Sequence, residues 1–321
     1  MNSGRRIEKA HNPGEVAAIR RLYSEAIVNA GHLWDAAHAG PPDPRVAITL
    51  VDDLAHAVAQ NRTALVAVTQ LKAHDESMST HMVNVAILTM AQADMLGIQG
   101  ALLREFGVAA LLHDIGKVRT PIEILSKPDK LTDAEFAIMR MHVVDGAEIL
   151  RATPELPALA PTVAFEHHLR LDGSGYPIGV MRKALNLGTM LCSIADVHDA
   201  MRSHRAYQES FPTDRILEVL KRNDGLQFDQ HLVERFTQLM GIYPPGELVK
   251  LDTGELGVVV RVNPEDPYRP HVRVIVAADG ERLPRPYDVN LSESRDEPAK
   301  PRNVVSAVDP TELGIDPLTY L

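Results

Sequence analysis

The residues best suited to chemistry lie in and around one short run, Leu111–Lys117, which reads LLHDIGK. His113 and Asp114 end an apolar run, so both side chains can point into one metal site. Imidazole and carboxylate groups are ligands that suit iron, manganese and zinc. Lys117 follows one helical turn after His113 and would place a positive charge beside that site. Matching ligand candidates recur on either side of this run, at His81, His142, His167, His168 and Asp196.

Three motifs in this part of the chain resemble those of the HD-GYP family, a bacterial branch of the HD metallophosphohydrolases. They are HDIGK at 113–117, GYP at 175–177 and IADVHDA at 194–200. The resemblance runs from about residue 70 to about residue 240. It implies a helical bundle that holds two or three metals and hydrolyses the bacterial second messenger cyclic di-GMP. The product would be linear pGpG, and further cleavage to GMP stays open.

The resemblance also implies a set of metal ligands, position by position. Asp114 would bridge two metals, because its carboxylate can offer one oxygen to each. Ligation by histidine and carboxylate without thiolate favours iron or manganese over a structural zinc site. A water that bridges two such metals loses a proton easily, and the resulting hydroxide can act as the nucleophile. The remaining expected ligands are His81, His113, His142, His167, His168 and Asp196.

The expected number of metals follows from one departure from the family pattern. Some members carry a glutamate four residues before the first metal histidine, where it helps to hold a third metal. Here that position is Ser77, and the neighbouring Glu76 would point about 100° away on a helix. We therefore expect a binuclear site.

Other residues are expected to contact the substrate. In the family pattern Lys117 acts on the scissile phosphate, and Arg205 grips phosphate through its guanidinium fork. A plainer interpretation of Lys117 is a solvated lysine at the end of a helix. The loop Gly175-Tyr176-Pro177 would lie near the substrate, and in the family it is linked to contacts with diguanylate cyclase domains. Its glycine and proline residues also fit a rigid turn.

Two positions near the motifs depart from the family pattern. Leu169 stands where a glutamate usually follows the two histidines, and His198 stands where a tyrosine is usual. Neither is an expected metal ligand, so we expect altered tuning and not loss of the site. His198 and His204 are candidates for contacts with the substrate or with the ligands.

Composition excludes several classes of protein. The chain has 321 residues, of which 45% are hydrophobic, enough for one core and a smaller unit. A net charge of −10 argues against binding to nucleic acid polymers, so an anionic substrate would need local cations. The single cysteine, Cys192, excludes an intrachain disulfide and fits a reducing cytoplasm. No apolar run approaches the ~20 residues that span a bilayer, and no signal peptide is visible, so we expect a cytoplasmic protein.

The chain is expected to be mainly α, with a helical HD-type bundle followed by a small SH3-like β-barrel. Residues 1–70 read as helices interrupted at 40–44, and would form a cap or the dimerisation region of a homodimer. Residues 71–243 form the metallohydrolase domain. Within them, Thr132 and Glu135 make a capping box that starts a helix continuing to Leu150.

The C-terminal part has the period of strands. Residues 244–295 would form the β domain, with strands at 248–251, 256–263 and 271–277. Residues 296–321 are rich in proline, aspartate and serine, and we expect a loosely ordered tail.

Three functional interpretations stay open at this point. The first is a metal-dependent cyclic di-GMP phosphodiesterase, which the complete ligand set and Lys117 favour. The second is a regulatory protein with weak catalysis that binds a cyclic dinucleotide or a diguanylate cyclase, which Leu169 and the missing third-metal glutamate favour. The third is a hydrolase of another cyclic dinucleotide.

Overall fold

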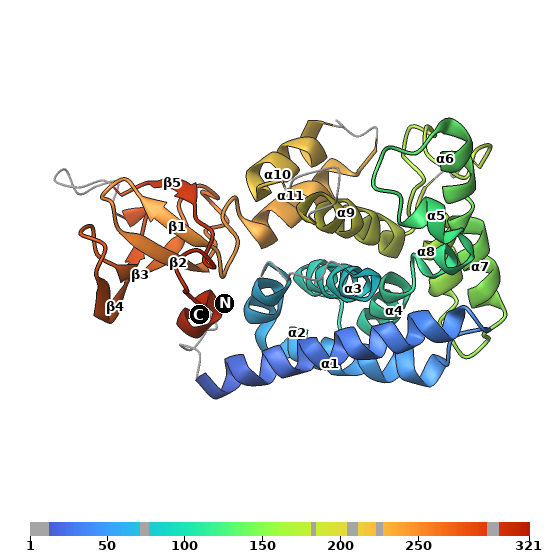
Figure 1. Ribbon diagram of the computed structural model, residues 1–321, viewed down its shortest axis with the longest axis horizontal. Helices are drawn as coiled ribbons and strands as arrows, with labels where there is room; N and C mark the ends of the chain where they lie inside the picture. Colours follow the sequence, from blue (N-terminus) through green and yellow to red (C-terminus); the bar gives the residue numbers. More distant parts are fainter. Residues whose placement is uncertain (1–12, 71–76, 181–183, 204–210, 223–226, 294–301) are drawn as a thin grey trace, which may run out of the picture.

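The computed structural model describes residues 13–70, 77–180, 184–203, 211–222, 227–293 and 302–321. Helices α1 to α11 form a bundle, and a five-stranded antiparallel sheet lies at one end of it (Figure 1). The mainly α fold with a small C-terminal β unit is therefore confirmed. Among the described residues, the structure contains no helix that is both long enough and apolar enough to cross a membrane.

Two long helices begin the described chain. Helix α1 (Pro13–Ala37) and helix α2 (Pro44–Thr69) are separated where the prolines at 41–44 were expected to break the helix. Asp43 caps α2 by accepting a hydrogen bond from the Arg45 backbone at 2.9 Å, and Pro44 occupies the first helical position. Most buried side chains of both helices, such as Leu33 and Leu54, belong to the same core as the helices that follow.

The centre of the bundle is built on α3 (Met78–Met95), which is buried along most of its length. Ser77 caps its start, and Gly97 follows its end with a φ of 82°. Helix α4 (Gly100–Leu111) packs against α3 and leads into the 3₁₀ helix η1 (Ile115–Arg119). Helices α9 (Leu187–Arg202) and α11 (Gln230–Met240) also pack against α3, and α10 (Thr213–Arg222) packs against α9 and α11.

Short helices close the end of the bundle farthest from the sheet (Figure 1). They are α5 (Ile122–Leu125), α6 (Asp133–Met139), α7 (His142–Arg151) and α8 (Leu159–Glu166). The predicted capping box between Thr132 and Glu135 is present at the start of α6.

The single helix expected from Thr132 to Leu150 was wrong, because the chain breaks between α6 and α7. At the break the Met141 backbone N–H donates to the Ile138 carbonyl, and His142 Nδ1 donates to the Met139 carbonyl at 2.7 Å. Because of the break, α7 begins at His142, whose imidazole ring is buried in the interior.

The C-terminal sheet has the strand order β4-β3-β2-β1-β5. The expected strands are β1 (Leu248–Leu251), β2 (Leu256–Arg261) and β3 (His271–Val276). Strand β4 (Arg282–Asn290) was not predicted, because it contains two prolines and its side chains are mostly exposed.

The last residues differ from the loosely ordered tail that we expected. Strand β5 (Val304–Ala307) pairs with β1 in the register Val249↔Ala307. The 3₁₀ helix η3 (Pro317–Tyr320) buries Leu318 in a second core. Proline and aspartate dominate the composition here and hide the few apolar residues that hold the segment in place. Residues 294–301 lie outside the described part of the chain.

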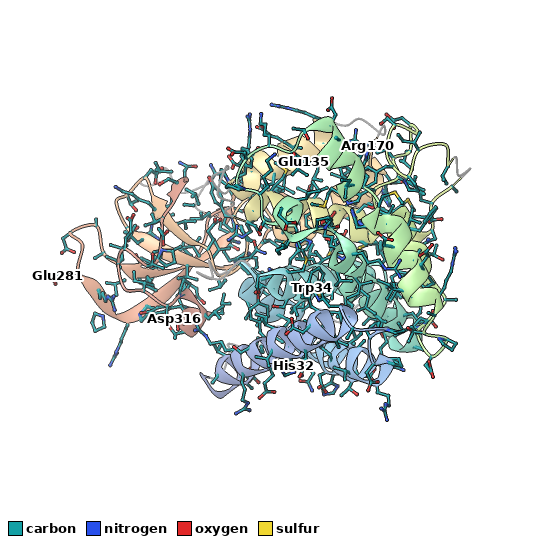
Figure 2. The ribbon with its side chains drawn as sticks, turned by 45° about the vertical axis from the view of Figure 1, so that its right-hand side comes forward. His32, Trp34, Glu135, Arg170, Glu281 and Asp316 are labelled. Carbon is teal, nitrogen blue, oxygen red and sulfur yellow. The ribbon has the colours of Figure 1, made fainter. Side chains whose placement is uncertain are left out.

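The C-terminal unit packs against the beginning of the bundle. Val16 of α1 and Val68 of α2 share a core with Leu248, Val258 and Leu318. Arg20 also forms an ion pair with Asp316. Figure 2 places Asp316 on the side of the sheet that faces the helices, and Glu281 at the opposite end. Helix α1 therefore contacts both parts of the molecule.

Candidate metal centre

The structure brings together all seven ligand candidates, although they come from five separate segments. Each segment supplies its ligands at or near a helix end, except α9, which supplies Asp196 from its middle. The others are His81 in the first turn of α3, His113 and Asp114 after α4, His142 at the start of α7, and His167 and His168 after α8.

The ligand atoms form two groups that share Asp114. The first group is His81, His113, Asp114 and Asp196, and the second is Asp114, His142, His167 and His168; within each group the ligand atoms lie within 4.8 Å of one another. Asp114 Oδ2 lies 3.6 Å from His81 Nε2 and 3.4 Å from His113 Nε2. Its Oδ1 lies 3.3 Å from His142 Nε2 and 3.5 Å from His167 Nε2. Each oxygen thus faces a different group of histidines.

Gly116 explains how α7 comes so close to Asp114. A Cβ at this position would overlap the carbonyl oxygen of His142 and the backbone of Gly146. Two glycines therefore allow η1 and α7 to touch backbone to backbone, which carries His142 to the Oδ1 side of Asp114.

Hydrogen bonds on the far side of the rings fix the direction of the imidazoles. The Nδ1 atom of His113 donates to the Ala110 carbonyl at 2.7 Å, and that of His142 donates to the Met139 carbonyl at 2.7 Å. The Nδ1 atom of His167 lies 3.0 Å from the Ala164 carbonyl. These bonds keep a proton on Nδ1 and direct Nε2 into the site, where its lone pair can bind a metal once any proton on it is displaced.

For His81 the corresponding partner is a carboxylate that our sequence analysis did not assign. Asp199 Oδ2 accepts from His81 Nδ1 at 2.7 Å, and Asp199 Oδ1 accepts from Asn84 Nδ2 at 2.9 Å. Asp199 lies three residues after Asp196 and so falls on the same face of α9. That spacing was a usable signal. Asn84 lies three residues after His81 and carried the same signal on α3.

Burial and neighbouring charges shift the pKa values of His113 and Asp114 in opposite directions. Burial lowers the pKa of His113, but the carboxylates of Asp114 and Asp196 outweigh it and raise that pKa to about 9. Burial raises the pKa of Asp114, but Lys117 and His113 hold it well below its usual value. Burial lowers the pKa of His142 to about 3, so its imidazole is neutral, which is the form that binds metals.

The residues fit divalent cations by an independent observation. His113 Nε2 and Asp114 Oδ1 are fully buried, and neither has a hydrogen-bond partner among the described residues. Buried polar atoms without partners are costly, and a cation between them would remove that cost. The donors are nitrogen and oxygen atoms, with no thiolate in either group. The coordination chemistry of the chain is therefore that of a divalent metal centre.

Lys117 lies beside this centre. Its Nζ pairs with Asp114 Oδ2, and its side chain is 18% exposed. The solvated helix end considered above does not describe this position. Lys117 lies in η1, three residues after Asp114, and this spacing places its ammonium group next to the Asp114 carboxylate.

The GYP loop packs against the histidines of the second group. The ring of Tyr176 lies 4.5 Å from that of His168 and 6.0 Å from that of His142. A Cβ at Gly175 would overlap the His168 carbonyl oxygen, so only glycine allows this contact. Pro177 completes the turn, and Leu169, which follows the two histidines, is buried.

Three further contacts were expected, from His198, His204 and Arg205. Arg205 and His204 lie outside the described residues. His198 is fully buried against Phe236, with ring centroids 5.1 Å apart, and does not reach the ligands. It follows Asp196 by two residues on α9, so it points about 200° away from that ligand.

A cavity of about 1250 Å³ opens beside the ligands. From the centre it passes the loop with Lys127 and Lys130, and it reaches the C-terminal unit at residues 307–310. Its wall at the centre is formed by Lys117, His142, His168, Tyr176 and Asp196.

Comparison with known families defines the class of protein. Residues 50–232 match the family of the HD domain, and residues 248–314 match the KOW domain associated with the HD domain. The chain therefore belongs to the HD-domain family. The second match also agrees with the expected SH3-like C-terminal unit and extends it past residue 295.

The relatives agree with the HD-GYP branch that the motifs indicated. A cyclic di-GMP phosphodiesterase of Pseudomonas aeruginosa is 36% identical over 273 residues, which are 85% of this chain but 63% of the relative. The chain thus spans less than two thirds of that relative. A 3′3′-cGAMP-specific phosphodiesterase of Vibrio cholerae is 35% identical over 165 residues, 51% of this chain and 32% of the relative.

One solved structure supports the fold. It is an HDG"Y"P protein from Bdellovibrio bacteriovorus, with a TM-score of 0.58 and 19% identity. The match covers 69% of this chain and 71% of that one.

Proposed function

We propose that this protein is a cyclic di-GMP phosphodiesterase that uses two divalent metals, iron or manganese, to open the substrate to pGpG. The observation that carries the proposal is the position of Asp114, whose two oxygens face two separate groups of histidines. A single buried carboxylate in this position suits two cations better than one. The similarity to the cyclic di-GMP phosphodiesterase of Pseudomonas aeruginosa supports the substrate.

The chain's own residues hold and orient the reacting groups. His81, His113 and Asp196 form one side, and His142, His167 and His168 form the other. Two cations held there would supply Lewis acidity and a water of lowered pKa. The cavity beside them admits the phosphodiester, and the ring of Tyr176 forms the wall next to His168.

Lys117 is the residue that we assign to the scissile phosphate. Its ammonium group lies at the cavity wall beside Asp114, where it can donate to a phosphate oxygen. In that position it would stabilise the negative charge that develops on the departing oxygen. Arg205 is proposed, from its motif alone, to hold a phosphate before the reaction.

The further expectations belong to the same proposal. The enzyme would act in the cytoplasm, the GYP loop would contact a diguanylate cyclase, and residues 1–70 would support a homodimer. A second substrate is favoured by one specific observation, the similarity to the 3′3′-cGAMP-specific phosphodiesterase of Vibrio cholerae. The proposed alternative is therefore a hydrolase of that hybrid dinucleotide.

The experiment that tests the proposal compares the two substrates directly. Protein is loaded with Fe²⁺ or Mn²⁺ without oxygen, incubated with cyclic di-GMP or 3′3′-cGAMP, and the products are separated by chromatography. Formation of pGpG at the higher rate supports the proposal. Faster cleavage of 3′3′-cGAMP would transfer the assignment to the alternative. Binding without cleavage of either substrate would make the protein a regulatory one.

A further inference from the structure

A chain of hydrogen bonds connects the N-terminal helix α1 to the metal centre. The Tyr23 hydroxyl donates to Asn84 Oδ1 at 2.7 Å, and Asn84 Nδ2 donates to Asp199 Oδ1 at 2.9 Å. Asp199 Oδ2 then accepts from His81 Nδ1 at 2.7 Å. His81 Nε2 at the end of the chain lies 3.2 Å from Asp196 Oδ1, within the first ligand group.

The amide of Asn84 is held in one orientation by its partners at both ends, the Tyr23 hydroxyl and the Asp199 carboxylate. An amide has a donating and an accepting end, and it can rotate to exchange them. The Tyr23 hydroxyl holds the oxygen of Asn84 toward α1, which leaves the amide nitrogen for Asp199. With Asn84 and Asp199 both buried, an exchanged amide would place its oxygen against the carboxylate.

Tyr23 is suited to act as a permanent donor. Burial and the charge of Asp199 raise the pKa of Tyr23 above its ordinary value, so the hydroxyl keeps its proton. Asp199 in turn needs to accept on both oxygens, one from Asn84 and one from His81. That arrangement orients the His81 ring and increases the basicity of its Nε2.

Tyr23 lies where the helical bundle meets the C-terminal unit. Tyr23 packs against the core of the bundle and also against the core that α1 shares with the C-terminal sheet. One turn earlier on α1, Arg20 pairs with Asp316 of the C-terminal unit. The residue that orients Asn84 is thus held between the two parts of the molecule.

We propose that Tyr23 is a positioning residue for the metal centre, which acts through Asn84 and Asp199 to keep His81 directed at the metal of the first group. Helix α1 is then part of the metal-binding apparatus and more than a cap on the bundle. This inference rests on the proposed metal centre but not on the identity of the substrate.

The test uses Tyr23→Phe, which removes one hydroxyl and keeps the packing of the ring. Metal affinity is measured by competition with a chelator, without substrate, for Mn²⁺ and anaerobic Fe²⁺. Removal of a partner of a ligating histidine typically costs 10–100-fold in affinity, and we expect about tenfold for this more remote group. The loss should affect one of the two metals, because the second ligand group does not include His81.

Two controls separate positioning from general stability. Tyr268→Phe removes the hydroxyl of a tyrosine that is 65% exposed, and it should leave both affinities unchanged. Ile27→Val loosens the packing of α1 against the core, and it should lower the melting temperature without weakening metal binding.

A double-mutant cycle with Asn84→Ala decides whether the effect passes through the amide. In that background Tyr23→Phe should cause no further loss of metal affinity. Unchanged affinity in the single variant, an equal loss in the Asn84→Ala background, or the same loss in Ile27→Val would each overturn the inference. A wild-type protein that binds no metal would instead refute the metal centre itself.

Discussion

At the scale of single residues, Asp114 determines the design of the site. Its two oxygens face two groups of imidazoles, and its Oδ1 atom is buried without a hydrogen-bond partner among the described residues. The sequence predicted His113 and Asp114 as neighbouring ligand candidates at the end of an apolar run, and the resemblance to the HD-GYP family implied that Asp114 bridges two metals. Asp199 was missed as a partner of His81. Its spacing of three residues from Asp196 indicated a shared face of α9, but only the packing of α9 against α3 shows that this face meets His81.

Replacement of Asp114 should empty the site. In Asp114→Ala both metals lose a shared ligand, so metal content should fall from two per chain to less than one, and hydrolysis should be lost. Metal analysis and the chromatographic assay measure these effects, with circular dichroism as a check on folding. Asp145→Ala removes an acid that pairs with Arg119 outside both ligand groups, and it should keep both metals. Wild-type metal content and activity in Asp114→Ala would disprove the assignment.

Lys117 should affect chemistry and not metal binding. An ammonium group has no free lone pair at neutral pH, so Lys117→Ala should retain both metals. Turnover should fall by ~10²-fold, as expected for one preorganised electrostatic group. Steady-state kinetics on metal-loaded protein measures this, with Lys250→Ala on the exposed side of β1 as the matched control. Loss of the metals, or an unchanged rate, would show that Lys117 has a different role.

Metal affinity should depend on pH through His113. In the metal-free protein the pKa of His113 is raised to about 9, so at pH 7 both ring nitrogens carry a proton and the ring is positively charged. A metal must displace the Nε2 proton, so apparent affinity should rise between pH 7 and 9, by up to about tenfold per pH unit for each displaced proton, and then level off. Chelator competition at several pH values measures the slope. A flat profile would mean that His113 is already neutral at pH 7.

At the scale of elements, helix ends place the ligands and glycines allow the ends to meet. The sequence predicted α3 and the first three strands, because apolar periodicity and capping residues are local signals. The break between α6 and α7 was not predictable in the same way. At the break His142 Nδ1 donates to the Met139 carbonyl, and η1 packs against Gly146 from a separate segment, a contact that no local pattern in the sequence indicates.

Gly116 should be the most sensitive glycine of this arrangement. In Gly116→Ala the new methyl group would overlap the backbone of α7, so η1 must move away and His142 loses its position. We expect a loss of about 2 kcal/mol in the free energy of unfolding, together with weaker metal binding. Gly40→Ala is the matched control, because no atom lies within 4 Å of the added Cβ. Thermal unfolding and metal analysis compare the two, and equal behaviour would contradict the role of close packing.

At the scale of the whole molecule, the helical bundle and the C-terminal unit are joined by a common core and a common cavity. The C-terminal unit shares a core with α1 and α2, and the segment at 307–310 borders the cavity that begins at the metal ligands. The ordered segment at 302–321 was hidden from sequence analysis, because its few apolar residues find their partners far away along the chain. With a net charge of −10, an anionic substrate depends on the cations gathered at the centre and on the lysines beside it.

The central claim is a pair of metals bridged by Asp114, and anomalous diffraction from anaerobically loaded crystals tests it most directly. With Ser77 in place of a third-metal glutamate, we predict two metal peaks. One should be bound by Asp114 Oδ2 with the His81 group, and the other by Asp114 Oδ1 with the His142 group. A single peak, three close peaks, or two peaks that do not share Asp114 would contradict the account.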